Sequence, residues 1–280
     1  MKTQIYVCYH KHSPIPQSDI LFPIHVGRSL SQVDLGFSGD DTKDNISSKN
    51  KHFCELTATY WIWKNSRADI KGLFHYRRFF NLKSNDTKFN KITDSFSDDF
   101  GLDENNINYL MSENDVILPL LVVNPPKKNP PTIYEHYTRE HIKSDMDCLL
   151  SVINEKYPHM STVTNRTIRD ETDFYGCNML IAKKEIFDEY AEWLFDVLFE
   201  VEKRIHVDVL TRDAYQQRVY GFLAERMMRI FIEYKKETSN IRVKEVPLLY
   251  LEDDNKKWRK YQLKKIKHKI LKFLKLKKDA

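Results

Sequence analysis

The sequence predicts an α/β fold in which a mostly parallel sheet is flanked by helices. Short runs of β-forming apolar residues alternate along the 280-residue chain with longer segments whose apolar residues recur at helical spacing. Such an alternation favours a parallel sheet, because each helix carries the chain back across a face of the sheet. Apolar residues make up 41% of the chain and charged residues 30%, which is typical of a globular protein with a sizeable core.

The elements follow one another as strand and helix with few long interruptions. The expected strands are residues 4–8, 69–74, 115–123, 178–181 and 241–251. The expected helices are residues 49–65, 133–156, 184–204 and about 211–235. Residues 12–46 are expected to be mostly loop, 81–105 a polar surface excursion, and 159–173 a polar connection. Trp61, Trp63 and Trp193 lie at helical spacing among apolar residues, so they are expected in the core.

Cysteine usage and the apolar pattern indicate a cytoplasmic protein. Cys8, Cys54, Cys148 and Cys177 show no close pairing and are expected to be buried free thiols in a reducing compartment. The sequence has neither an N-terminal signal pattern nor an apolar run of about 18 residues, so no membrane-spanning helix is expected.

Charge is distributed very unevenly. Residues 256–280 hold 12 of the 45 Lys and Arg residues but only one of the 40 acids, so the rest of the chain is mildly acidic. Leu263, Ile266, Ile270 and Phe273 recur at helical spacing in this basic segment. We therefore expect two parts, residues 1–251 as the main domain and 252–280 as a basic amphipathic helix on an anionic membrane surface. A disordered or partner-bound tail is the alternative, and the acidic body disfavours nucleic acid as a partner.

Polar side chains follow the first two expected strands. Tyr9–Lys11 come after the first strand and His75–Arg78 after the second. Ligands of open α/β sheets bind at the carboxyl ends of the strands, so the two segments are expected to share one cleft. Arg77 and Arg78 suit an anion, because a guanidinium pairs with phosphate oxygens bidentately and can neutralise a diphosphate leaving group. Ion pairs with surface carboxylates are the alternative for these arginines.

Carboxylates on the expected loops are candidates for proton transfer. A transfer onto a hydroxyl group needs a carboxylate that takes up its proton, and Asp41, Asp44 and Asp173 are candidates for this base. Asn45 and Asn50 would hydrogen-bond hydroxyl groups of the ligand. The alternative is a solvated acidic turn before a helix N-terminus, where the helix dipole favours aspartate.

The sequence offers little that would hold a metal ion or a phosphate in a glycine-rich loop. It contains 7 glycines and neither GxGxxG nor GxxxxGK[ST]. A literal DxD occurs at Asp145–Asp147, but residues two apart on a helix point to different sides, so we expect a solvated helix face there. The ten histidines show no HExxH spacing. We expect no metal ion and no other cofactor.

Two long motifs make the sequence recognisable. They are DDTKDNISSKNKHFCELTATYWIWKN at residues 40–65 and GLFHYRRFF at residues 72–80. Their wording resembles a family of bacterial cell-surface-polysaccharide glycosyltransferases first catalogued as a domain of unknown function. The similarity extends over roughly residues 4–248 and includes YEHYTREHIKSDMD at 134–147. Lys43 stands where the family commonly has glycine, and residues 81–105 do not match it.

The resemblance implies a GT-A-like single Rossmann-type domain that transfers a sugar from a nucleotide-sugar donor without the usual metal motif. Some members of the family use UDP-galactofuranose, so we expect an inverting, β-linked galactofuranose transfer to a lipid-linked glycan in capsule, exopolysaccharide or O-antigen synthesis. The alternatives are transfer of galactopyranose or N-acetylhexosamine, and a non-catalytic glycan-binding or membrane-binding module. Carried over by position, the nucleotide-sugar-binding candidates are His10, Lys11, Asn45, Asn50, His75, Tyr76, Arg77, Arg78, His136, Asn178, Glu225 and Arg226. Glu55 is a further candidate on a helix, and Glu225 with Arg226 is a candidate buried ion pair.

Overall fold

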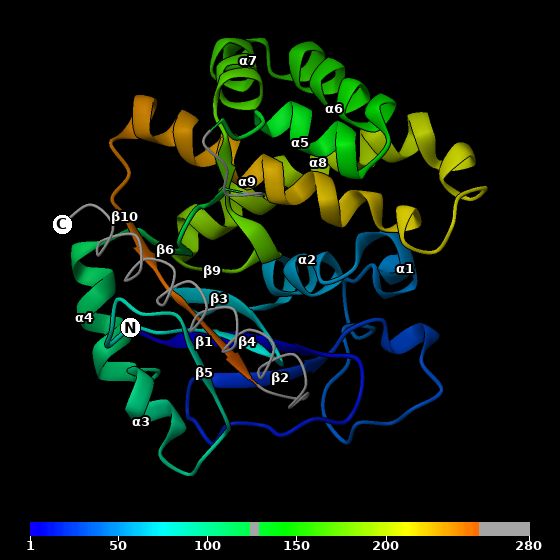
Figure 1. Ribbon diagram of the computed structural model, residues 1–280. Helices are drawn as coiled ribbons and strands as arrows, with labels where there is room; N and C mark the ends of the chain where they lie inside the picture. Colours follow the sequence, from blue (N-terminus) through cyan, green and yellow to red (C-terminus); the bar gives the residue numbers. More distant parts are fainter. Residues whose placement is uncertain (124–128, 252–280) are drawn as a thin grey trace, which may run out of the picture.

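A computed structural model describes residues 1–123 and 129–251, and it confirms the α/β fold with a central sheet between helices (Figure 1). Within these residues the main sheet has nine strands, and β7 (Val122–Val123) pairs with β8 (Asp173–Phe174) outside it. The main-sheet strands are β1 (Thr3–Tyr9), β2 (Leu21–His25), β3 (Ile70–His75), β4 (Arg78–Phe80), β5 (Lys88–Asn90), β6 (Val116–Pro119), β9 (Leu180–Lys183), β10 (Val243–Val246) and β11 (Leu248–Leu251).

Helices cover both faces of this sheet. The described α-helices are α1 (Asn50–Phe53), α2 (Leu56–Asn65), α3 (Phe96–Phe100), α4 (Glu104–Glu113), α5 (Ile133–Glu140), α6 (Lys143–Lys156), α7 (Ser161–Asp170), α8 (Lys184–Val209) and α9 (Val219–Ser239). Short 3₁₀ turns connect them at η1 (Arg28–Leu30), η2 (Ser47–Lys49), η3 (Pro158–Met160), η4 (Gly176–Asn178) and η5 (Gln216–Arg218).

The main sheet is mixed, although most of its strands share one direction. Its central body runs β2-β1-β3-β9-β6-β10, and only β9 pairs antiparallel with its neighbours there. The short strand β4 leaves the end of β3 antiparallel and carries β11 and β5 with it. The expected parallel sheet is therefore interrupted at β9 and β4, so the sheet is not uniformly parallel.

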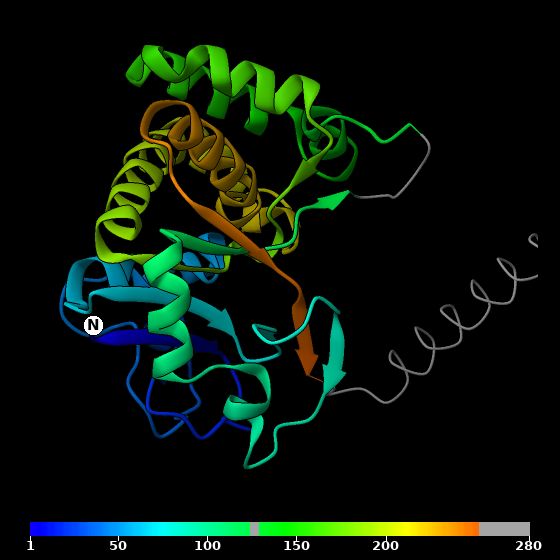
Figure 2. The ribbon, with the colours of Figure 1, turned by 90° about the vertical axis from the view of Figure 1, so that its left-hand side faces the viewer.

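The first strand shows how the sheet separates two hydrophobic cores. Tyr6 and Cys8 of β1 face one cluster, and Ile5, Val7 and Tyr9 face the other, as the period of two in a strand requires. The first cluster is completed by α2, α8 and α9, with α5, α6 and α7 stacked outside them (Figures 1 and 2). The second is completed by residues of α3 and α4. Burial on both faces explains the nearly continuous apolar sequence of β1.

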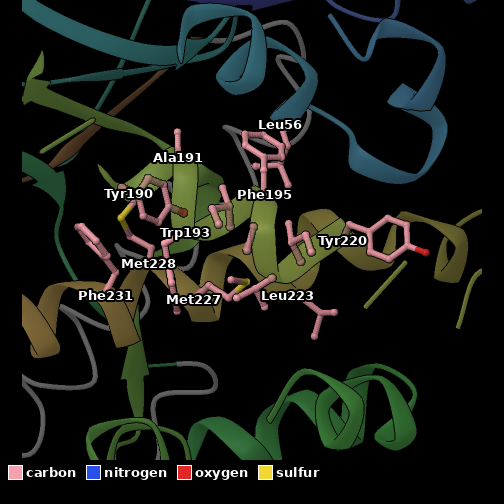
Figure 3. Packing of buried hydrophobic residues seen from close by; sticks show 14 of the residues in the cluster. Leu56, Tyr190, Ala191, Trp193, Phe195, Tyr220, Leu223, Met227, Met228 and Phe231 are labelled. Carbon is pink, nitrogen blue, oxygen red and sulfur yellow. The ribbon is translucent and has the colours of Figure 1, made fainter. Parts of the chain in front are cut away.

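The packing between α8 and α9 forms the interior of the helical layer. Figure 3 shows Tyr190, Trp193, Met227 and Phe231 meeting between the two helices. The rings of Trp193 and Phe231 lie 5.9 Å apart, centroid to centroid. Trp61 and Trp193 are buried as expected, whereas Trp63 is only half-buried.

Two expected helices are broken in the structure. The helix expected over residues 49–65 is interrupted at Cys54, whose φ of +52° is incompatible with a right-handed helix. The helix expected over 133–156 is interrupted at His141, which adopts an extended conformation between α5 and α6. Similarly, the strand expected over 241–251 divides at Pro247, which has no N–H to donate to a ladder.

Several elements were not expected from the sequence. The strand β2 lies in the expected loop, and α4 lies partly in the expected polar excursion. The expected polar connection forms α7, whose buried residues include Thr164, Thr167 and Ile168. Threonine is polar and has a low helix propensity, so a helix that buries threonines shows no clear apolar pattern in the sequence.

The DxD segment is not a solvated helix face. The side chain of Asp145 is 1% exposed and accepts two hydrogen bonds of 2.7 Å from Arg212. Asp147 instead pairs with Lys143 at 2.6 Å on the outside of α6. Asp145 therefore holds the connection after α8 against α6, and its carboxylate is already paired with Arg212.

All four cysteines are free, but of the four only Cys8 is buried, so the expectation of four buried thiols is corrected. Among the described residues, no helix is long and apolar enough to cross a membrane. The basic segment predicted to be an amphipathic helix, residues 252–280, lies outside the described residues.

Candidate functional site

A pocket of about 650 Å³ opens where β1 and β3 end. The two strands pair in parallel with Cys8 opposite His75, so the polar segments that follow them come together as predicted. The predicted site residues that line this pocket are His10, Asn50, His75, Tyr76, Arg77, Arg78 and Glu225. Glu55 from the start of α2 lines it as well.

Cations dominate the pocket. Arg77 and Arg78 come from the turn after β3, Lys51 from α1, and Arg218 from the start of α9. The Arg77 guanidinium lies 5.0 Å from the centre of the Tyr76 ring, and Nζ of Lys11 lies 5.7 Å from it. Arg218 donates from Nε to Sγ of Cys54 at 3.3 Å. Guanidinium groups from two separate elements therefore converge on one cavity, which suits a ligand with several anionic oxygens.

His75 is held as a neutral donor. Its Nε2 donates a hydrogen bond of 2.7 Å to the carbonyl oxygen of Cys177, which fixes the proton on that nitrogen. Burial lowers the pKa of His75, and nearby Arg78 lowers it further against the opposing effect of Glu55. The ring is therefore uncharged near neutral pH and serves to orient the pocket wall.

The wall opposite β3 has an unusual backbone. Cys177 and Asn178 are consecutive non-glycine residues with φ of +77° and +49° in the turn before β9. Cys54, on the other side of the pocket, has a φ of +52°. Non-glycine residues adopt this region at an energetic cost, and such residues concentrate where a site requires a particular backbone. The three residues all lie in or beside the pocket.

Two carboxylates line the pocket, and their surroundings differ. One oxygen of Glu55 accepts a hydrogen bond of 2.7 Å from the side-chain amide of Asn178, and the Glu55 side chain is half-buried at the pocket wall. Glu225 has both oxygens engaged, one by the backbone N–H of Cys177 and one by Arg226, each at 2.8 Å. Burial raises the pKa of Glu225, and the attraction of Arg226 opposes that rise. Glu55 is thus the more available of the two as a proton acceptor.

A buried polar chain lies behind Glu225. Arg226 is 2% exposed and pairs with Glu225 as predicted from the sequence, and it also contacts Nδ1 of His136 at 3.1 Å. Burial lowers the pKa of both Arg226 and His136. His136, Asn178 and Arg226 therefore support the pocket from behind and do not line it.

Four of the predicted site residues lie away from the pocket. Asp41 is exposed, and Asn45 donates to the backbone carbonyls of Asp41 and Lys43 in the same loop. Asp44 accepts a hydrogen bond of 3.1 Å from the hydroxyl of Tyr60. Asp173 lies 3.3 Å from Arg229 at the start of β8. The structure does not bring these three carboxylates to the arginines after β3.

The acidic motif serves the fold through a neighbouring residue, Asp40. This carboxylate is fully buried and accepts hydrogen bonds from the backbone N–H of Gly27 and Arg28 and from the hydroxyls of Ser47 and Thr57. It therefore fastens the loop after β2 to the start of α2. Asn50 extends this arrangement by donating to the carbonyl of Cys54 at 2.7 Å.

Sequence reasoning did not select six residues that line the pocket: Cys8, Val26, Lys51, Cys54, Cys177 and Arg218. Burial raises the pKa of Cys54 to about 12 and that of Cys177 to about 11, so both thiols are protonated at neutral pH. Lys51 and Cys54 lie within the long motif that carries the resemblance, and this position was an available signal. Arg218 opens RVYGFLAERM at residues 218–227, a run that also resembles the family, but its side chain reaches the pocket only through the packing of α9.

Comparison with known proteins agrees with this fold. A solved structure described as the apo form of the WbbM bifunctional glycosyltransferase has a TM-score of 0.84 to this chain at 34% sequence identity. The similarity covers 90% of this chain and 46% of that protein, so the chain spans about half the length of this relative. A comparison with curated proteins gave no significant match.

Family membership rests on a separate comparison. Residues 4–237 match the model of a family described as a domain of unknown function, DUF4422. The match includes both long motifs and every residue that lines the pocket. Since it covers far more than half of the 280 residues, the chain belongs to the DUF4422 family.

Proposed function

We propose that this chain is a glycosyltransferase that uses the pocket at the ends of β1 and β3 to bind a UDP-sugar. The observation that carries the proposal is the convergence of Lys51, Arg77, Arg78 and Arg218 on a cavity that also holds two carboxylates. The likeness to a bifunctional glycosyltransferase at 34% identity supports the same class of reaction.

The cations would act on the leaving group. When the bond between the sugar and the diphosphate breaks, negative charge develops on the departing UDP, and fixed guanidinium groups stabilise it. Because these groups supply that charge, we propose that the transfer proceeds without a divalent metal ion and without another cofactor.

Glu55 is the base in this proposal. It removes the proton from the acceptor hydroxyl, whose oxygen attacks the anomeric carbon of the donor as the bond to UDP breaks on the opposite face. The anomeric configuration is thereby inverted, one glycosidic bond replaces another, and the proton remains on Glu55 until it passes to solvent. Glu55 takes this role in place of Asp41, Asp44 and Asp173, which lie away from the pocket.

The finer assignment is galactofuranose as the donor sugar and a lipid-linked glycan as the acceptor. It rests on the resemblance of the DDTKDNIS and HYRR motifs to enzymes of surface-polysaccharide synthesis. We propose that the enzyme works at the cytoplasmic face of the plasma membrane, held there by the basic residues 256–280. Transfer of a pyranose is the competing assignment.

A donor screen tests the proposal directly. Purified protein is incubated with a galactose-terminated or glucose-terminated lipid-linked acceptor and a panel of UDP-sugars, and UDP release is measured with and without EDTA. We expect turnover with UDP-galactofuranose that survives the chelator. Complete loss in EDTA would contradict the metal-independent reaction, and turnover only with another donor would contradict galactofuranose. Absence of turnover with every donor would leave a binding module.

A further inference from the structure

A second groove, of about 680 Å³, lies between α2, η3, α8 and α9. Among the described residues that line it, eight of fourteen are Phe, Tyr or Trp. Its volume matches that of the cationic pocket and falls in the range of small-molecule and oligosaccharide sites. We call it the aromatic groove.

Ring contacts join the aromatic side chains of the groove. Trp63 on α2 stacks on Phe195 with an interplanar angle of 5°, and Tyr60 meets Trp63 edge-on at 5.7 Å. Tyr157 meets Trp193 edge-on at 6.4 Å. Figure 3 shows Trp193 and Phe195 on the same helix, α8. The half-buried Tyr157 presents ring surface to the groove, whereas the ring of Trp63 is covered by Phe195 and Lys64.

The lysines and carboxylates in and beside the aromatic groove balance in charge. Glu189, Glu192 and Asp196 lie along α8 within it. Nζ of Lys235 pairs with Glu189 at 2.9 Å and Nζ of Lys156 pairs with Asp196 at 2.6 Å, so the remaining charges are those of Glu192 and Lys64. Asp196 also accepts a hydrogen bond of 2.7 Å from the hydroxyl of Tyr157, and Glu192 is exposed. A diphosphate is not favoured here, because it meets no excess of positive charge.

A cation is also a poor occupant, because the groove already holds one. Nζ of Lys64 lies 3.5 Å from the centre of the Trp63 ring, which is the position that a ligand ammonium group would take. An uncharged ligand with hydroxyl groups and apolar faces fits the remaining chemistry. Carboxylate oxygens accept hydrogen bonds from hydroxyls, and aromatic rings pack on the apolar faces of sugar rings.

The groove and the pocket share α9 but lie at different points along it. Glu225 lines the pocket and Tyr234 lines the groove, and nine residues of helix place them about 14 Å apart along the axis. Nine residues are also two and a half helical turns, so the two side chains leave α9 on opposite sides and the groove is a separate site from the pocket.

We propose that the aromatic groove binds a neutral oligosaccharide, namely the growing glycan at a distance from the sugar that is being extended. The identity of this ligand rests on the proposed function. Its binding does not require catalysis, so the two ideas can fail separately.

The test is calorimetric titration of the full chain with a soluble galactose-terminated tetrasaccharide. We expect millimolar or tighter binding that weakens about ten-fold in Tyr157→Ala, which removes the ring surface that lines the groove; ten-fold corresponds to about 1.4 kcal/mol. Glu192→Ala, at an exposed position, should weaken binding about three-fold without altering the fold. Tyr109→Ala, on α4 at a ring that is 66% exposed, is the matched control and should bind as wild type.

One further variant separates this groove from the pocket. Arg78→Ala should retain tetrasaccharide binding, whether or not the wild-type protein transfers any sugar. Absence of binding in the wild type, or binding that Arg78→Ala abolishes and the groove variants preserve, would overturn the proposal. It would also be overturned if a peptide of residues 256–280 bound the groove and the tetrasaccharide did not.

Discussion

The cationic pocket and the aromatic groove have nearly the same volume but different charge. The pocket is lined by Lys51, Arg77, Arg78 and Arg218, and the pKa values of its two histidines are lowered. The groove is lined by aromatic side chains and by carboxylates, of which Glu189 and Asp196 are paired with lysines. The excess of positive charge, and not the size of the cavity, therefore distinguishes a site for a nucleotide diphosphate from a site for an uncharged glycan.

The two regions also differ in how they are built. The pocket is formed by strand ends and by turns in which Cys54, Cys177 and Asn178 adopt positive φ. The groove is formed by side chains of three regular helices and one 3₁₀ turn. The backbone strain is thus concentrated where chemistry is proposed, whereas the groove needs only packing and surface exposure.

The largest expected effect is on catalysis at Glu55. Glu55→Gln preserves the hydrogen bond that Asn178 donates but cannot accept a proton, so kcat should fall about 10²- to 10⁴-fold. The KM for the UDP-sugar should change little, because Glu55 acts on the acceptor hydroxyl. Steady-state kinetics of UDP release measure both values.

The groove supplies the matched control for that substitution. Glu192→Gln makes the same chemical change at an exposed carboxylate outside the pocket, and transfer to a short acceptor should be unaffected. If Glu55→Gln retained wild-type kcat, Glu225 would become the candidate base, and the assignment to Glu55 would be wrong.

The next effect concerns the charge on the leaving group. Arg78→Ala should lower kcat/KM about 100-fold or more, because a positioned donor to developing negative charge is lost from the cavity. Arg139→Ala removes an arginine whose side chain is 58% exposed on α5, and it should change kcat/KM little. Equal losses in the two variants would show that net charge alone matters, which would argue against a built diphosphate site.

Much of the pocket could be predicted from the sequence, because it is set by local pattern and strand pairing. The apolar runs predicted β1 and β3, and their parallel register brings His10 and His75–Arg78 to one edge. The carboxylates could not be assigned in the same way. Asp41 and Asp44 stand in the most acidic segment, but the fold uses Asp40 there to fasten two loops.

The rest depends on tertiary packing that no local pattern reports. The resemblance predicts Glu225 but gives no reason for its position, and Arg218 was not selected; both reach the pocket because α9 packs beside α1 and the turn at Cys177. Trp63 and Trp193 have the same helical apolar spacing in sequence, yet Trp193 is buried between helices and Trp63 is left half-exposed. Which ring faces a groove is decided by how the helices meet.

The smallest expected effect is a difference in pH dependence between the two regions. Partial burial, together with the charges of Lys11 and Arg77, lowers the pKa of His10. The side chain is therefore neutral at pH 7.5 and gains a proton as the pH falls toward 5.5. A bound diphosphate favours the protonated form, so by linkage UDP-sugar affinity should rise on acidification, by less than about ten-fold for a pKa shift of one unit.

Calorimetry of UDP-galactose binding at the two pH values checks this expectation. His10→Gln should remove most of the rise, because His75 is more deeply enclosed and has its Nε2 proton committed to the carbonyl of Cys177. Tetrasaccharide binding should change little over the same range, since an uncharged ligand is not coupled to a charge gained in the pocket. A rise that persists in His10→Gln would assign the proton to another group of the pocket, and an equal rise for the tetrasaccharide would mean that the two regions are not electrostatically distinct.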